Sequence, residues 1–421
     1  MLEQAVQERQ DDSAYPQVDN NQDVAAGTHK GQTYHSFQTR TERAILGAPL
    51  EVGRAHELLG VIAANVGQFT EALQRFHRAL AIFEQHDLVI ALAQVYSNLG
   101  AVHAVKSENS MALTYMQRSL ELAERLGDQP NIAIVIGNLG EMAARSGNVQ
   151  QAEEWFRRSL AMAERINEAD QMSWCNVALS TALLDQGHLA GAAKCIRRAL
   201  SIARSMKSSR NIGGALIALA DFRIVQAIIA CILQVARQEE HNRAGNVMQP
   251  SKMCVRFLRR AKSTIQRALM VEGLEIELVV EGLLILASAH FLLGDVEKAK
   301  QEAMRTMKEA ERYELTRMLG RSYRLLGRIL AAQGENTRAD AYFEQALKVF
   351  NDRELRLDYA RALHGYGVAL LERHTSTDAQ LNKGIACLHE ARDIFAACHA
   401  TIDLEWVNHV SASYSSTTVG A

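Results

Sequence analysis

A pattern of small and large apolar residues recurs along the chain with a period of 40 residues. The small residues form two series, Gly60, Gly100, Gly140, Ser180 and Ala220, and then Ala287, Gly327 and Gly367. A turn residue, usually Gly, stands seven positions after most of them, and Ala stands twelve positions after most of them. A fixed period of this length is typical of a repeat architecture, and it decides how local features are interpreted.

Each period predicts one hairpin of two helices. In the first helix, large residues lie one turn apart around the small residue, as Tyr96 and Leu99 do around Gly100. In the second helix, Ala112 and Met116 are four positions apart and share one face. Small residues let the two helices cross closely, and bulky residues fill the gaps beside them. Because one hairpin cannot cover its own apolar face, neighbouring hairpins must stack, which predicts an all-α solenoid.

This pattern resembles the tetratricopeptide repeat (TPR). The agreement is closest in the seventh unit, at Tyr323, Leu326, Gly327, Leu330, Ala339, Phe343 and Ala346. The usual TPR period is about 34 residues, so each helix here gains most of a turn. The proline that usually closes the unit is missing. Over residues 50–400 the resemblance implies a right-handed superhelical solenoid of about eight hairpins, whose first helices line an inner groove.

The array departs from its period in the fifth unit. From Ala220 to Ala287 the step is 67 residues rather than 40, a surplus of 27. The first helix of this unit is predicted to run over about 211–237, and the second to begin near Lys252. Between them we expect an insertion loop over 241–251, which contains Pro250. A surface insertion without a function is the simplest interpretation, because long loops cost little.

These patterns divide the chain into five segments. Residues 1–45 are polar and without a period, so we expect disorder there with at most a short helix around 39–46. Repeats 1–4 and the first helix of repeat 5 occupy 46–240, followed by the insertion loop over 241–251. The second helix of repeat 5 and repeats 6–8 occupy 252–400, and a C-terminal capping remnant and tail occupy 401–421.

Composition narrows the class of protein. The chain is 48% hydrophobic with four prolines, which favours helix, and its 46 basic and 48 acidic residues leave a net charge of −2. No global field is therefore available to attract nucleic acid or an anionic membrane. The longest apolar run, within 224–236, is shorter than the about 20 residues that a membrane helix needs. Six cysteines without a CxxC pair fit reduced core residues, so we predict a cytoplasmic protein.

Motifs of catalysis and metal binding are absent from the sequence. It contains no GxxxxGK[ST], HExxH or GxSxG motif, and no GxGxxG that follows a strand. Cys387 and His389 are close in sequence, but two residues apart on a helix they point in nearly opposite directions. We therefore predict a protein that is not an enzyme and has no metal site and no cofactor.

Two stretches of the predicted inner groove are candidates for binding. The first is a basic stripe in repeats seven and eight, formed by Arg317, Arg321, Arg324, Arg328, Arg361 and His364. Four arginines on one helix face repel one another unless an anion or carboxylates meet them. Glu277 and Glu281 occupy the matching stripe of the sixth repeat and could neutralise them in part. The stripe is either a site for an acidic peptide or anion, or a solvated face with internal salt bridges.

The second candidate is an apolar groove in repeats two to four. It comprises Gln94, Ser97, Asn98, Ile134, Asn138, Glu141 and Trp174. The resemblance implies that Asn98 and Asn138 hold the backbone of an extended ligand, since an amide both donates and accepts hydrogen bonds. The alternative is that Ile134 and Trp174 simply pack between neighbouring repeats.

These observations lead to one prediction of function and one alternative. We predict a non-enzymatic protein- or peptide-binding scaffold or adaptor in cytoplasmic signalling or regulation, whose partner carries an acidic segment. We expect neither membrane nor nucleic-acid binding, because the basic cluster around Arg256 and Arg259 lacks interleaved aromatics. The alternative is a sensor of a small signalling peptide or anionic metabolite. The 40-residue units resemble the C-terminal repeat region of bacterial signalling ATPases and transcriptional regulators, so such a sensor would be detached from, or partner, one of these.

Overall fold

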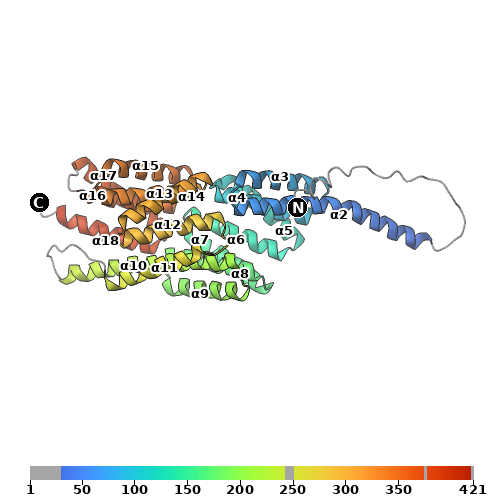
Figure 1. Ribbon diagram of the computed structural model, residues 1–421, viewed down its shortest axis with the longest axis horizontal. Coiled ribbons are helices and arrows are strands. Elements are labelled where there is room, and N and C mark those ends of the chain that lie inside the picture. The colour runs from blue at the N-terminus through green and yellow to red at the C-terminus, as the bar shows by residue number, and fades with distance from the viewer. Residues whose placement is uncertain (1–29, 242–250, 374–376, 419–421) are drawn as a thin grey trace.

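The computed structural model describes residues 30–241, 251–373 and 377–418, and within them the chain is entirely α-helical, with 17 helices and no strand (Figure 1). Consecutive helices pair as hairpins, as the 40-residue period predicts. The pairs are α2 (Lys30–Asn65) with α3 (Phe69–Gln85), α4 (Val89–Val105) with α5 (Asn109–Leu126), α6 (Gln129–Arg145) with α7 (Val149–Arg165), α8 (Ala169–Asp185) with α9 (Leu189–Ser205), α10 (Ser209–His241) with α11 (Lys252–Leu269), α12 (Ile276–Leu292) with α13 (Val296–Arg312), α14 (Thr316–Ala332) with α15 (Asn336–Asp352), and α16 (Arg356–Leu371) with α17 (Asp378–Ala397). Helix α18 (Thr401–Thr418) follows the eighth hairpin. The prediction of an all-α solenoid of helical hairpins is confirmed.

The small residues of the period lie where the two helices of a hairpin cross. A Cβ atom on Gly100 would stand 2.8 Å from Cγ of Met116, and one on Gly140 would stand 2.9 Å from the ring of Phe156. Such contacts are too close for a larger residue without displacement of the neighbour. The period therefore marks the closest approach of each helix pair, as the sequence pattern predicts.

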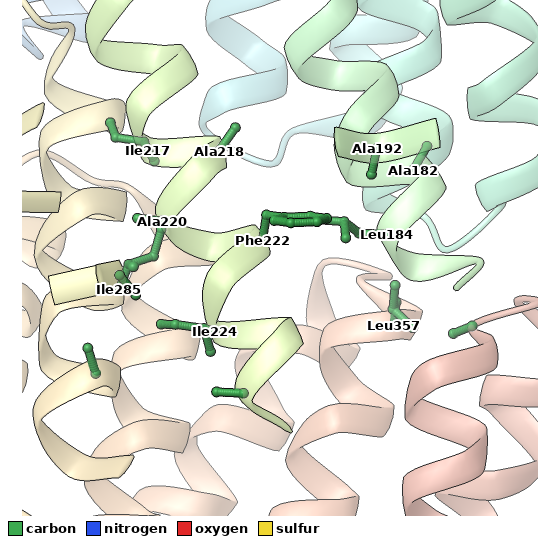
Figure 2. Close-up of a cluster of buried hydrophobic side chains, with 14 of the residues drawn as sticks. Ala182, Leu184, Ala192, Ile217, Ala218, Ala220, Phe222, Ile224, Ile285 and Leu357 are labelled. Atoms are coloured by element: carbon green, nitrogen blue, oxygen red, sulfur yellow. The ribbon is translucent and has the colours of Figure 1, made fainter. Parts of the chain in front are cut away.

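Buried apolar side chains form several clusters, and the largest joins hairpins from α7 to α18. Figure 2 shows part of this cluster, with Phe222 of α10 beside Leu184 of α8, and Ile285 contributed by α12. Phe222 is 8% exposed and Ile285 3%. Because each hairpin supplies only one layer of this core, the stability of each repeat depends on its neighbours.

The solenoid closes on itself, because loops of early hairpins contact loops that lie five hairpins later. A Cβ atom on Gly67 would collide with the ring of Tyr313, and one on Gly147 would stand 2.8 Å from Sγ of Cys398. Both glycines also have positive φ, at 82° and 85°, so the close contact and the backbone conformation both disfavour a side chain there. The amide Nδ2 of Asn109 donates to the carbonyl of Arg353 over 3.0 Å at the same junction. The first helices of the hairpins consequently face a narrow inner channel.

The N-terminal boundary differs from the prediction. Helix α2 begins at Lys30 rather than near residue 39 or 46, while residues 1–29 lie outside the described residues. Once the packed segment after Leu50 is helical, each preceding residue adds a hydrogen bond at little cost, so the helix extends into a polar sequence. A start of the first helix that is inferred from polarity alone therefore lies too far towards the C-terminus.

Helix α10 has 33 residues, and the α10–α11 hairpin is the long one that the surplus in the fifth repeat predicts. Most of the expected loop over 241–251 lies outside the described residues. The apolar run that the sequence analysis places within 224–236 is shorter than the apolar stretch of the helix. Among the described residues, Ser209–Gln234 is one stretch long and apolar enough to cross a membrane by length and composition, with a mean hydropathy of 2.2. Ala215, Ala220 and Ile224 of this stretch are buried in the core, as in a central helix of a helical stack.

Candidate functional site

A cavity of about 320 Å³ opens on the inner channel between the first helices of hairpins one to seven. Its polar and aromatic lining includes Asn138, Glu141 and Arg145 of α6, Trp174 of α8, Asn211 of α10, Glu277 and Glu281 of α12, and Arg317 of α14. Helices far apart in the sequence thus meet at one cavity because the solenoid is tightly wound. Three predicted groove residues, Asn138, Glu141 and Trp174, are brought together there with Arg317 of the predicted basic stripe.

Trp174 packs between neighbouring hairpins, as one interpretation of the sequence predicts, and it also lines the cavity. Its ring meets Phe156 edge-on, with centroids 6.0 Å apart, and lies so close to Gly137 that a Cβ atom there would stand 2.7 Å from it. The side chain therefore packs between neighbouring hairpins. It also remains partly exposed and lines the cavity, so one face of the indole is available to a ligand.

Asn138 has a free amide among the described residues. No hydrogen bond joins its side chain to another described residue, and the side chain is partly exposed on the cavity wall. Asn98, the equivalent residue one repeat earlier, is different, since its Nδ2 donates to Oε1 of Glu57 over 3.1 Å. Of the two asparagines that the resemblance singles out, only Asn138 is thus free to bind a peptide group.

The remaining groove residues do not line this cavity. Gln94 accepts a hydrogen bond from Nη1 of Arg54 over 2.7 Å, and Ser97 is buried. Ile134 is 38% exposed beside the channel. Of the predicted apolar groove, only residues in repeats three and four therefore line the cavity.

A buried guanidinium forms one wall of the cavity. Nη2 of Arg145 lies 2.5 Å from Oε1 of Glu141 and 2.8 Å from Oε1 of Glu277, and Nη1 donates to the carbonyl of Ala104 over 3.0 Å. Burial opposes the charge of Arg145, but the two carboxylates more than offset it and raise its pKa. Burial raises the pKa of Glu277, and the nearby charges of Glu141 and Glu281 add to that rise. This ion pair joins helices α6 and α12, which are three hairpins apart.

The predicted basic stripe is partly neutralised by carboxylates. Nε of Arg317 lies 2.7 Å from Oδ2 of Asp358, and Nη1 of Arg321 lies 3.1 Å from Oε1 of Glu281. The prediction that Glu281 meets the stripe is confirmed, whereas Glu277 forms its ion pair with Arg145 and acts on Arg317 only through the proximity of their charges.

Arg361 and Asp358 join further helices to this network. Nη2 of Arg361 bridges Oδ1 of Asp185 at 2.6 Å and Oδ2 of Asp403 at 2.7 Å, which connects α16 to α8 and α18. Burial alone would raise the pKa of Asp358, but Arg317 and the arginines near it hold that pKa well below its usual value. The carboxylate of Asp358 is therefore charged and central to the network.

Arg324, Arg328 and His364 of the predicted stripe differ from its other residues, because none of the three is paired with a carboxylate of a described residue. Arg324 and Arg328 make no ion pair with a described residue, although the guanidinium of Arg328 lies 5.3 Å from the ring centroid of Phe291. His364 is buried against Trp406, with ring centroids 5.1 Å apart, and burial lowers its pKa to about 4. A neutral, buried His364 adds no positive charge to the stripe, contrary to its predicted place in an exposed groove.

Several charged residues of the channel were not identified from the sequence. They are Arg145, Asp185, Asp221, Asp358 and Asp403. The sequence does indicate some of these ion pairs, because partners on adjacent first helices are separated by about one period. The separation is 41 residues for Arg317 and Asp358 and 40 residues for Arg321 and Glu281. Aligning the repeats by charge would have found these pairs. The contacts of Arg361 with Asp185 and of Arg145 with Glu277 have no such spacing.

Family models of the tetratricopeptide repeat match residues 91–165, 131–205 and 324–390. No curated protein matches the sequence.

Among solved structures, the Rap conjugation gene regulator of plasmid pLS20, in complex with a Phr peptide, is 12% identical with a TM-score of 0.55, covering 88% of this chain and 96% of that one. Aspartyl phosphate phosphatase F of Bacillus subtilis is 10% identical with a TM-score of 0.48, covering 89% and 96%. A signal-transduction ATPase with a tetratricopeptide repeat sensor from Pyrococcus horikoshii is 13% identical with a TM-score of 0.44, and the match covers 88% of this chain and 54% of that one.

The likeness to the pLS20 regulator concerns the fold, since so low an identity carries no further information. The family models identify the repeats themselves on both sides of the long α10–α11 hairpin. Together with the stacked hairpins, they show that this chain contains tetratricopeptide repeats over 91–205 and 324–390.

Proposed function

We propose that the protein is a non-catalytic scaffold that binds an extended peptide segment of a partner in the inner channel. The observation that carries the proposal is the cavity that is lined both by the free amide of Asn138 and by the partly exposed indole of Trp174. An amide can bind both polar groups of a peptide bond, and an indole face accepts an apolar or cationic side chain. The pLS20 regulator, which shares the fold, holds a Phr peptide.

The test is selection of peptides from a random display library on the full-length protein, followed by affinity measurement on variants. Asn138→Ala should weaken the selected peptide about tenfold, since one or two hydrogen bonds are lost, and Trp174→Ala should weaken it further. Asn382→Ala, an exposed asparagine on α17, is the matched control. Selected peptides whose affinity is unchanged in Asn138→Ala and Trp174→Ala would place binding elsewhere and refute the proposal.

A ligand-responsive sensor is the second candidate, and the ion pairs between distant helices favour it. Arg145 with Glu277 and Arg361 with Asp185 fix the spacing of helices that face each other across the channel. A ligand that competes for these groups would change the pitch of the solenoid, because its binding energy differs between the two arrangements. Solution scattering should then show a change in radius of gyration when the selected peptide is added. An unchanged radius at saturation would favour the scaffold.

A further inference from the structure

In the second half of α14, two arginines have no hydrogen-bond or ion-pair partner among the described residues, although the carboxylates of Asp358 and Glu372 favour their charge from a distance. Arg324 and Arg328 are one helical turn apart and lie on one face of the helix. Neither makes a hydrogen bond or an ion pair with another described residue, whereas Arg317 and Arg321 on the same helix each hold a carboxylate. The stripe is therefore divided into a paired half and an unpaired half.

The surroundings of Arg324 do not favour its charge. Burial lowers its pKa to about 9, and the neighbouring guanidinium groups of Arg321 and Arg361 add to that lowering, while Asp358 opposes it. Arginine nevertheless keeps its proton in proteins at neutral pH. The repulsion between Arg324 and its neighbouring guanidinium groups is therefore relieved by binding an anion and not by loss of a proton.

The contacts of Arg328 leave its donors available. Its guanidinium carbon lies 5.3 Å from the ring centroid of Phe291 on α12, and its methylene carbons pass Gly365 on α16, where a Cβ atom would stand 3.5 Å from Cδ. The ring and the glycine position the side chain without accepting its N–H groups. Both arginines are partly exposed, so an anion from solvent can reach them.

We propose that Arg324 and Arg328 form a binding site for a doubly charged oxyanion of the phosphate-monoester class. Each guanidinium presents a planar fork of N–H donors, and the pair together carries two positive charges. A phosphate monoester presents three oxygens and nearly two negative charges at neutral pH, whereas a carboxylate would neutralise only one of the two. The inference goes beyond the proposed peptide function and does not depend on it, because Asn138 and Trp174 are not part of the pair.

The experiment uses the full-length protein with inorganic phosphate as the probe and acetate as the comparison, at constant ionic strength. Calorimetric titration should give saturable phosphate binding, and the melting temperature should rise with phosphate by mass action but much less with acetate. In Arg324→Gln/Arg328→Gln the phosphate affinity should fall by at least about tenfold. Arg256→Gln/Arg259→Gln removes two exposed arginines from α11 and should leave it unchanged.

Folding of the variant is checked in the same measurement. Without phosphate, Arg324→Gln/Arg328→Gln should still unfold cooperatively and melt close to the wild type, because the lost contact of Arg328 with Phe291 is offset by the lost repulsion between guanidinium groups. Absence of a phosphate-specific response in the wild type, or an equal response in the double variant, would overturn the inference. Either result would leave peptide binding through Asn138 intact. Glycerol phosphate and a phosphoserine peptide then distinguish a free ester from a modified partner, by which of the two binds more tightly.

Discussion

The early hairpins and the late hairpins share the same scaffold but are held together by different forces. Within the early hairpins, neutral hydrogen bonds join the two helices of a pair: Oγ of Ser119 on α5 donates to the carbonyl of Ala93 on α4, and Oγ of Ser159 on α7 donates to that of Ala133 on α6, each over 2.6 Å and across 26 residues. Between the late hairpins, ion pairs such as Arg317 on α14 with Asp358 on α16 join neighbouring first helices, and Arg145 on α6 is the early residue that reaches them, through Glu277 on α12. The helix-crossing glycines are the same in both regions.

The difference shows that the repeat fixes the core positions and leaves the inner face free to vary. A buried ion pair stabilises little overall, because desolvation offsets the attraction, but breaking it leaves an uncompensated charge. A neutral contact in a close-packed core instead responds to volume. We therefore expect the late region to be sensitive to charge and pH, and the early region to be sensitive to the size of side chains.

The largest expected effect is loss of the central carboxylate of the late region. Asp358→Asn should lower the free energy of unfolding by about 3–5 kcal/mol, since the arginines around it are left without a counter-charge. Because the pKa of Asp358 is depressed, its contribution is present above about pH 4 and is lost as the pH falls. Urea unfolding measures both. Asp393→Asn, at an exposed residue of α17, should change stability little, and equal losses in the two variants would contradict the charge-sensitive region.

In the early region the corresponding test is one of volume. Gly140→Leu should lower the free energy of unfolding by about 1–3 kcal/mol, because its side chain collides with the ring of Phe156. Gly214→Ala is the matched control, since a Cβ atom there would meet only Cδ1 of Leu278 at 3.7 Å. That control should stabilise α10 by up to about 1 kcal/mol through helix propensity. Denaturant melts in which Gly140→Leu is silent would show that the helix crossing is assigned incorrectly.

Asp221 lies on α10, between the early and the late region. Its contribution to stability should change with pH in the opposite direction to that of Asp358. Burial raises its pKa to about 6, with Glu281 and Asp185 adding to the rise against Arg321. The folded protein therefore prefers the protonated form, and stability declines as the pH rises from about 4 to about 6. Asp221→Asn should be more stable than the wild type by about 1–3 kcal/mol at neutral pH and nearly equal to it near pH 4. A difference that is independent of pH in urea melts would contradict the burial of this carboxylate.

The smallest expected effect is the loss of one neutral hydrogen bond in the early region. Ser159→Ala removes the donor to the carbonyl of Ala133, although Nε2 of Gln171 still reaches that oxygen at 3.3 Å. The loss of free energy of unfolding should be about 0.5–1.5 kcal/mol and should not vary between pH 5 and 8. Ser110→Ala, at an exposed residue of α5, should cost less. A strong pH dependence in Ser159→Ala would show that the charges of Glu141 and Arg145 on α6 influence this neutral contact.

The hairpins, their number, the glycines at the crossings and the long fifth unit can all be derived from the amino-acid sequence, because each depends on contacts within one period or with the next. The sequence also indicates the ion pairs of α14 with α12 and α16, and of α16 with α18, whose partners are 40 to 42 residues apart. Which arginines are paired across the channel depends instead on the tertiary structure. Arg145 meets Glu277 at a separation of 132 residues, and Arg361 meets Asp185 at 176. These contacts depend on the pitch of the solenoid, which accumulates from small rotations between successive hairpins and is encoded at no single position. The same accumulation brings Asn138, Trp174 and Arg317 to one cavity, while Arg324 and Arg328 make no hydrogen bond or ion pair with another described residue.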